Sequence, residues 1–376
     1  MSIDFSSCRW EHTIDNYRRW WSKELKRPII QVATPNHDPG RPEPELVKEY
    51  YASAYGLTVS AEAIVDRWDY NLSRLTYFGD AFPNHMPFFG AGVLAAFLGA
   101  RLEQRAETCW FHPPAETEPA DIAFRFDPEN QWFKRICELY TNAAERWEGS
   151  VQLNMTDLGG GLDILSSFRP GDKLLFDLFD HPGEVKRLNW EIHELWWKYF
   201  DKFNSIIGST NPGYTAWTPL LSEEPYYMLQ CDFCYMISPE MFDEFVKPEL
   251  TASCKRLKNA FYHLDGPGQL PHLDSLLEIE ELKGVQWIPG TGSPGIGHWP
   301  EVFRKIRDAG KLIQFYGDFH DLDTIVGQLG SPEGLATIMV DPDGQPITSG
   351  VGEMSETEIT DALHKYGVVG KRCFFT

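Results

Sequence analysis

The stretch AFYHLDGPGQLPHLDSLLEIEELKGVQWIPG, residues 260–290, decides the fold of this chain. It begins with a short apolar run that ends at Asp265, continues through a polar turn into a helical segment, and finishes with a second apolar run at 284–290. A strand, a helix and a strand in this order form a unit whose two strands lie parallel in one sheet. The stretch therefore predicts an α/β protein built on a parallel sheet.

The same alternation of strands and helices continues on both sides of this stretch. Further strands are predicted at 28–34, 151–157, 214–221, 226–232, 311–318 and 336–341. A helix is predicted from Pro239 to about residue 259, with Ser238 as its N-cap. A last helix is expected at 355–366, where Ser355 and Glu358 have the spacing of a capping box.

The number of strands indicates how the sheet is arranged. About eight or nine short strands in one chain favour a closed (β/α)8 TIM barrel, and a doubly wound sheet is the alternative. We expect a single domain over residues 1–376, with an N-terminal helix within 1–27 and a small β insertion at 105–131.

Composition narrows the class of partner. The chain has 34 Lys and Arg against 55 Asp and Glu, a net charge of −21, which argues against nucleic acids and anionic membrane surfaces. Its seven cysteines are scattered, as in a protein with reduced thiols, and the N-terminus has no signal pattern. We expect a cytoplasmic protein that acts on a small molecule, as a monomer or homodimer.

Aspartates end five of the predicted strands. The carboxyl ends of barrel strands share one face, where active sites of this architecture are built, so an acidic mouth is predicted. Crowded carboxylates need protons, hydrogen bonds, a metal, or a cationic or polyhydroxyl ligand to offset their repulsion, and at least one should otherwise have a raised pKa. The alternative is that each aspartate caps the helix that follows. The five residues are Asp157, Asp232, Asp265, Asp318 and Asp341.

His263 and Asp265 form the densest group of candidate catalytic residues. Two positions apart on a strand, they point to the same side, and we expect both to project into the largest pocket. An imidazole beside a carboxylate acts as an acid/base pair or as two ligands of a divalent metal. The alternative is a core histidine bonded to a structural carboxylate.

Other residues near predicted strand ends complete the expected site. His320, just past the strand at 311–318, is a further acid/base candidate, and Asp157 is another candidate catalytic residue. Asp232, Asp318 and Asn154 are expected to contact the substrate. Trp217 and Trp287 would wall the mouth of the barrel, unless they pack in the core.

Longer runs of sequence resemble the uroporphyrinogen decarboxylase superfamily. The resemblance is carried by CDFCYMISPEMFDEFVKPEL (231–250) and FYHLDGPGQLPHLDSLLEI (261–279), and 158–188 and 305–319 fit the same pattern. It implies a (β/α)8 barrel with its site at the carboxyl ends of the strands. In the decarboxylase branch an Arg-rich segment follows the first strand. The matching segment here, 35–45, offers only Arg41, so a polyanionic porphyrinogen is a poor substrate.

The other branch of that superfamily transfers methyl groups to or from corrinoid proteins, with a zinc held by a His-x-Cys pair and a later Cys. This sequence is similar at His263, but Asp265 stands in place of the first Cys and Asp341 lies near the third position. The resemblance then implies a harder set, His263, Asp265 and Asp341, for zinc or another divalent metal. Such a set suits an oxygen or amine substrate better than a thiol.

We therefore expect a metal-assisted methyltransferase that moves a methyl group from a small substrate to a corrinoid protein or a related acceptor. Two alternatives remain open. One is a lyase or decarboxylase that acts on a small non-porphyrin substrate. The other is a non-catalytic small-molecule binding protein on the same scaffold.

Overall fold

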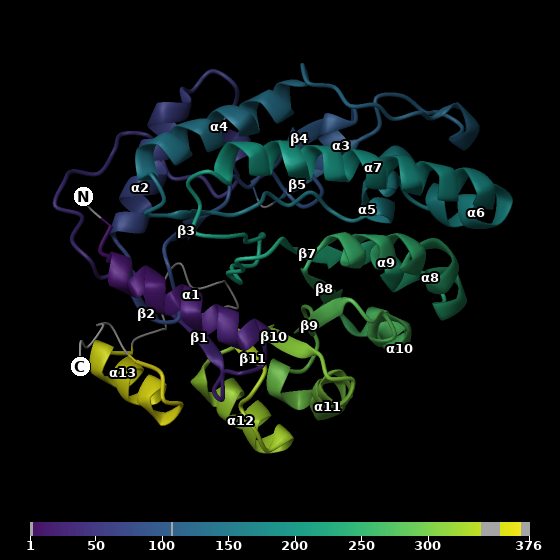
Figure 1. Ribbon diagram of the computed structural model, residues 1–376. Coiled ribbons are helices and arrows are strands. Elements are labelled where there is room, and N and C mark those ends of the chain that lie inside the picture. Colours follow the sequence, from purple (N-terminus) through teal and green to yellow (C-terminus); the bar gives the residue numbers. More distant parts are fainter. Residues whose placement is uncertain (1–2, 107, 340–353, 370–376) are drawn as a thin grey trace.

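A computed structural model describes residues 3–106, 108–339 and 354–369 and shows a mixed α/β architecture (Figure 1). Its central sheet has seven strands in the order β2-β1-β11-β10-β9-β8-β7. Every neighbouring pair is parallel except β1 with β2. The strands are β1 (Ile29–Thr34), β2 (Thr76–Gly79), β7 (Tyr226–Gln230), β8 (Asn259–Asp265), β9 (Leu282–Ile288), β10 (Leu312–Tyr316) and β11 (Leu335–Ile338). The predicted parallel sheet is confirmed.

Helices follow most of the parallel strands and cover the sheet (Figure 1). The predicted capping box of the last helix is present, since Ser355 and Glu358 each accept a backbone hydrogen bond from the other. None of the helices in the described ranges combines the length and apolar character that crossing a membrane needs. The helices are α1 (Ser7–Trp21), α2 (Ala61–Ser73), α3 (Leu94–Phe97), α4 (Gln131–Trp147), α5 (Gly161–Phe168), α6 (Lys173–Asp180), α7 (Pro182–Ile207), α8 (Pro239–Phe245), α9 (Lys247–Arg256), α10 (Leu273–Leu277), α11 (Pro300–Asp308), α12 (Phe319–Leu329) and α13 (Glu356–Lys365).

Four short strands stand outside the central sheet. β3 (Asn84–His85) and β6 (Gln152–Leu153) form a parallel pair, and β4 (Arg101–Gln104) and β5 (Cys109–His112) form an antiparallel hairpin at the start of the expected β insertion. The pairings among the described residues do not by themselves close the predicted eight-stranded ring. The closed barrel therefore stays a prediction.

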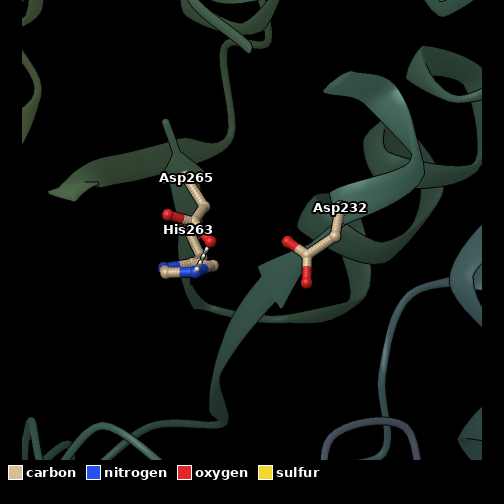
Figure 2. A group of neighbouring side chains, drawn as sticks. All are labelled: Asp232, His263 and Asp265. Carbon is tan, nitrogen blue, oxygen red and sulfur yellow. Dashed lines mark ion pairs between the residues drawn. The ribbon is translucent and has the colours of Figure 1, made fainter. Parts of the chain in front are cut away.

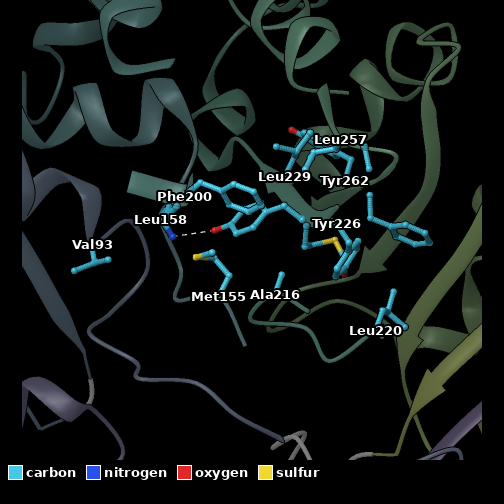
Figure 3. Close-up of a cluster of buried hydrophobic side chains, with 14 of the residues drawn as sticks. Val93, Met155, Leu158, Phe200, Ala216, Leu220, Tyr226, Leu229, Leu257 and Tyr262 are labelled. Atoms are coloured by element: carbon cyan, nitrogen blue, oxygen red, sulfur yellow. Dashed lines mark hydrogen bonds between the residues drawn. The ribbon is translucent and has the colours of Figure 1, made fainter. Parts of the chain in front are cut away.

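A continuous apolar core joins the sheet to its helices. Every residue of β7 is buried, and Figure 3 shows Tyr226 and Leu229 of this strand beside Tyr262 of β8 and Phe200 of α7. The Tyr227 hydroxyl, also on β7, accepts a hydrogen bond of 2.8 Å from the backbone N–H of a residue in the loop after β6. The core thus fixes the carboxyl end of β7 relative to that loop.

A row of polar side chains crosses the sheet at one level. The strand register pairs Gln230 with His263, His263 with Gln286, and Gln286 with Gln314. All three glutamines are buried. Residues paired across parallel strands point to the same side, so His263 lies in a row of amides on one face of the sheet.

Three predicted elements differ in the structure. The strand expected at 151–157 is reduced to β6, which spans two residues. Residues 214–221 form no strand, because backbone bonds between Tyr214 and Ser222 close this segment into a loop. The predicted helix at 239–259 divides into α8 and α9 at Val246, since Pro248 has no N–H to donate to the backbone carbonyl of Glu244, four residues back. Ser238 caps α8 as predicted.

Candidate functional site

Three side chains meet where β7 and β8 end. Asp232 begins the short 3-10 helix after β7, and His263 and Asp265 lie at the carboxyl end of strand β8 (Figure 2). One ligand atom from each lies within 4.8 Å of the other two, and His263 Nε2 is 3.8 Å from Asp265 Oδ2. We call these three residues the Asp–His–Asp cluster.

Neighbouring side chains fix the orientation of His263. Its Nδ1 contacts Gln286 Oε1 at short range, and Gln286 Nε2 donates to Thr218 Oγ1 at 3.3 Å. The ring of Trp217 meets the imidazole edge to face, with centroids 4.9 Å apart. Because the amide oxygen of Gln286 accepts from Nδ1, the lone pair of the neutral imidazole lies on Nε2, which faces the carboxylates.

Asp163 positions Asp232. Its carboxylate, in the first turn of α5, accepts hydrogen bonds from the backbone N–H groups of Asp232 (3.0 Å) and Phe233 (2.8 Å). Sequence reasoning missed Asp163, although an acidic residue just after the Gly-rich run 159–161 was a visible signal. The carboxylate bonds the two N–H groups at the start of the 3-10 helix and so holds the turn that carries Asp232.

Asp157 is a buried carboxyl beside the cluster, only 5% exposed. It follows β6, and its Oδ1 accepts from the backbone N–H of Gly159 at 3.0 Å. Burial, with the charge of Asp232, raises the pKa of Asp157 to about 7, and the same two causes raise the pKa of Asp163 to about 7. The expected carboxyl with a raised pKa is therefore present.

Charges within the cluster influence one another. Burial by itself lowers the pKa of His263, but the hydrogen bond with Asp265 and the charges of Asp232 and Asp265 outweigh it, so the pKa is raised. Asp232 is exposed, yet desolvation by surrounding protein atoms raises its pKa, while His263 opposes the shift. The imidazole thus takes up a proton readily when no cation sits between the carboxylates.

The remaining predicted site residues separate into two groups. Trp217 contacts His263 of the cluster, whereas Asn154 Oδ1 accepts from Thr215 Oγ1 at 2.6 Å. Asp318 instead caps α12, where it accepts from the N–H of Asp321 at 2.8 Å, so the capping alternative is right for it. Of the other predicted residues, His320 is exposed on α12 and Trp287 is fully buried. Asp341 lies outside the described residues.

Trp287 was predicted to wall the site, and this prediction is wrong. It neighbours Gln286 on β9, so its side chain points to the opposite face of the sheet. There it packs against Trp299 with ring centroids 5.1 Å apart. The core alternative holds for this residue.

A cavity of about 210 Å³ lies beside the cluster. Trp217 and Asn154 line it, together with residues of β1, β2, β3 and β10. His263 and Asp265 do not line it, contrary to expectation, because the Trp217 ring lies against the imidazole. The cavity and the cluster are therefore neighbours that share Trp217.

The donor atoms of the cluster fit a divalent metal of moderate hardness. One imidazole nitrogen and two carboxylates are a set that zinc and other first-row divalent ions accept. No cysteine of the described residues joins the cluster, and Cys231 and Cys234 are buried, which raises the pKa of Cys231 well above its ordinary value. Asp232 is the third member of the cluster among the described residues, and the prediction that Asp341 is a ligand falls outside them.

Comparison with known proteins supports the fold. No family model and no curated protein matches the chain. Among solved structures, a methyltransferase from Methanosarcina mazei is similar over 94% of this chain and 97% of its own, with 12% identity and a TM-score of 0.57. An enolase protein from the Sargasso Sea environmental genome covers 54% of this chain and 51% of its own, with 12% identity and a TM-score of 0.24, too low to support an argument. At such identity the first likeness shows a shared fold.

Proposed function

We propose that the protein is a methyltransferase on a (β/α)8 barrel. It takes a methyl group from an oxygen or nitrogen atom of a small substrate and passes it to a corrinoid on a partner protein, or to a related acceptor. The observation that carries the proposal is the Asp–His–Asp cluster at the carboxyl ends of neighbouring parallel strands. The fold shared with a methyltransferase supports it. Six parallel strands of the sheet and the β3–β6 pair supply the strands of the barrel.

Each residue of the site has a proposed task. Asp232, His263 and Asp265 hold a divalent metal, zinc by preference, which when bound would polarise the heteroatom that carries the methyl group. Gln286 keeps Nε2 of His263 directed at the metal site, and Asp163 keeps Asp232 in place. When the acceptor attacks the methyl carbon, the heteroatom leaves with the bonding electron pair and needs a proton.

Asp157 is the proposed source of that proton. A carboxyl whose pKa is raised to about 7 keeps its proton near neutral pH and can donate it to a leaving oxygen or nitrogen. The same property favours a second candidate function, a lyase or decarboxylase, in which Asp157 protonates a carbanion after carbon dioxide leaves.

Metal content and methyl transfer test the proposal together. The purified protein should hold about one divalent ion per chain, as three protein ligands allow. His263→Ala and Asp265→Asn should lose the metal, whereas His320→Ala, an exposed histidine on α12, should keep it. Reduced cobalamin is then offered with methanol, methylamines or methoxybenzenes, and methylcobalamin is followed by its absorbance.

The outcomes separate the candidate functions. Formation of methylcobalamin that depends on the cluster supports methyl transfer. Release of carbon dioxide from small carboxylic acids, with no methylcobalamin from any donor, replaces the proposal by the lyase. Ligand binding without metal or turnover replaces it by the binding protein.

A further inference from the structure

The cavity beside the cluster has aromatic and aliphatic walls. Trp217 and Tyr316 lie on the side of the cluster, and Tyr77 and Phe82 are further aromatic residues of the lining. Aliphatic side chains fill the spaces between them. They come from Val32, Ala33, Leu72, Leu75, Ala81, Pro219 and Ile338.

The lining carries no charge among the described residues. It includes no Asp, Glu, Lys or Arg from that part of the chain, and its polar members are amides, two phenols, an indole and one histidine. Burial, with Lys48 nearby, lowers the pKa of that histidine, His85, to about 3, so it is neutral. An ionised ligand would give up its hydration here without touching a charged side chain in the described lining, which costs several kcal/mol or more.

The volume limits the ligand to a single ring. A cavity of about 150 Å³ accommodates benzene. The present cavity of about 210 Å³ therefore takes one six-membered aromatic ring with one or two small substituents. A bicyclic compound or a porphyrinogen is too large.

One polar group in this wall lacks a partner. The Nε2 atom of His85 is buried and has no hydrogen-bond partner among the described residues. The ring packs on Trp68 with centroids 4.2 Å apart, which fixes its plane. An unpaired buried nitrogen costs about 1–3 kcal/mol, so a ligand oxygen that pairs with it is favoured.

A chain of contacts joins the cavity to the cluster. The Tyr316 hydroxyl, in the cavity wall, is 3.2 Å from Thr218 Oγ1, which accepts from Gln286, the partner of His263. On a second route, Trp217 has one side in the cavity wall and its ring against the imidazole. The cavity is therefore one side chain away from the Asp–His–Asp cluster, with the Trp217 ring between them.

We infer that the substrate is an uncharged, single-ring aromatic methyl ether, whose ring occupies this cavity and whose second oxygen pairs with His85. The methyl ether part of this inference rests on the proposed function. The uncharged ring is inferred from the cavity alone. Methylamines and methanol are then poor substrates, because an ammonium group meets no counter-charge in the cavity and methanol fills little of it.

Binding to the whole protein, measured by calorimetry without any acceptor, tests the inference separately from turnover. The probes are 4-methoxyphenol and 1,2-dimethoxybenzene, with 4-methoxybenzoate and 4-methoxybenzylammonium as charged analogues of similar size. The neutral ethers should bind at least about tenfold more tightly than either ion. His85→Phe, which keeps an aromatic ring but removes the nitrogens, should weaken 4-methoxyphenol about tenfold.

Two further variants keep the test decisive. Ala81→Leu and Ala33→Leu each fill part of the cavity and should abolish binding of the neutral ethers, while Trp190→Phe, on the exposed side of α7, should leave it unchanged. Circular dichroism checks that each variant is folded. If only one of the two Leu variants folds, that variant is enough to decide the test.

Equal or tighter binding of an ion, or unchanged binding in a folded Leu variant, overturns the inference. Binding of the ethers without methyl transfer upholds the ring site and refutes the proposed function. Methyl transfer from methylamine with no binding of the ethers supports the proposed function and refutes the ring site.

Discussion

Gln286→Leu should uncouple His263 from its support without moving the backbone. The leucine has a similar volume but cannot accept from Nδ1 of His263 or donate to Thr218 Oγ1, two contacts that the wild-type amide makes. Loss of the residue that orients a metal-binding histidine reduces metal affinity by about 10–100-fold. That ratio corresponds to about 1.4–2.8 kcal/mol of binding free energy.

The same substitution has a separate cost in folding. It leaves buried polar atoms of His263 and Thr218 with one partner fewer, so the free energy of unfolding should fall by about 1–3 kcal/mol. Zinc titration against a competing chelator measures the affinity, and urea denaturation of the metal-free protein measures the stability. The two effects are therefore read from different experiments.

Gln314→Leu is the matched control. Gln314 is the register partner of Gln286 on β10 and is equally buried, but its amide donates to the backbone of Phe315 and not to the cluster. This variant should bind zinc like the wild type. Gln286→Glu, which keeps an acceptor toward Nδ1, should retain most of the affinity. Unchanged zinc affinity in a folded Gln286→Leu protein would refute the assignment of Gln286 as the orienting residue.

Four other substitutions give separate expectations. The first is Asp157→Asn. In the wild type the pKa of Asp157 is about 7 in the folded state and near 3.9 in the unfolded state, so the folded protein binds more protons. The wild type therefore loses stability as pH rises from about 4 to about 7. The free energy of unfolding of the metal-free variant should therefore exceed that of the metal-free wild type by about 1–4 kcal/mol at pH 8 but by little at pH 4. Urea denaturation at the two pH values checks this, and a difference independent of pH contradicts the proposed cause. Asp163→Ala should weaken zinc binding about tenfold, because the turn that carries Asp232 loses two hydrogen bonds, and chelator competition measures it. Trp287→Phe should lower the unfolding free energy by about 1–3 kcal/mol and leave zinc affinity unchanged. A change in zinc affinity would indicate that Trp287 is part of the site. His320→Ala should change stability by less than about 0.5 kcal/mol and leave methyl transfer intact, and loss of transfer in a kinetic assay would restore its catalytic role.

The regular part of the fold was predictable because it follows from local pattern. Short apolar runs bounded by turn residues, such as 260–266 and 284–290, are typical of buried strands, and the helical stretch between them makes the strands parallel. The segment 214–221 has the same apolar character, yet it folds back through the Tyr214–Ser222 bridge. That outcome depends on backbone bonds between residues eight positions apart, which hydropathy does not report.

The site was predictable where it depends on strand alternation and not where it depends on packing. His263 and Asp265 lie together because residues two positions apart on a strand share a face. Asp163 and Gln286 reach the cluster from other elements, and their contacts depend on how α5 and β9 pack beside it. Asp265 is the last residue of its strand and Asp318 lies just past the end of its own, but Asp318 caps the helix that follows. Sequence alone does not decide between these two uses of an aspartate.

The row of amides across the sheet bears on how such a site arises in evolution. Gln230, Gln286 and Gln314 occupy the same level as His263 on their own strands. Glutamine and histidine codons differ by a single nucleotide, so each of these positions is one mutation from presenting an imidazole at the same depth. A single mutation at one of these positions places a histidine on a neighbouring strand and so moves the reactive centre sideways by one or more strands, while the sheet and its helices stay as they are.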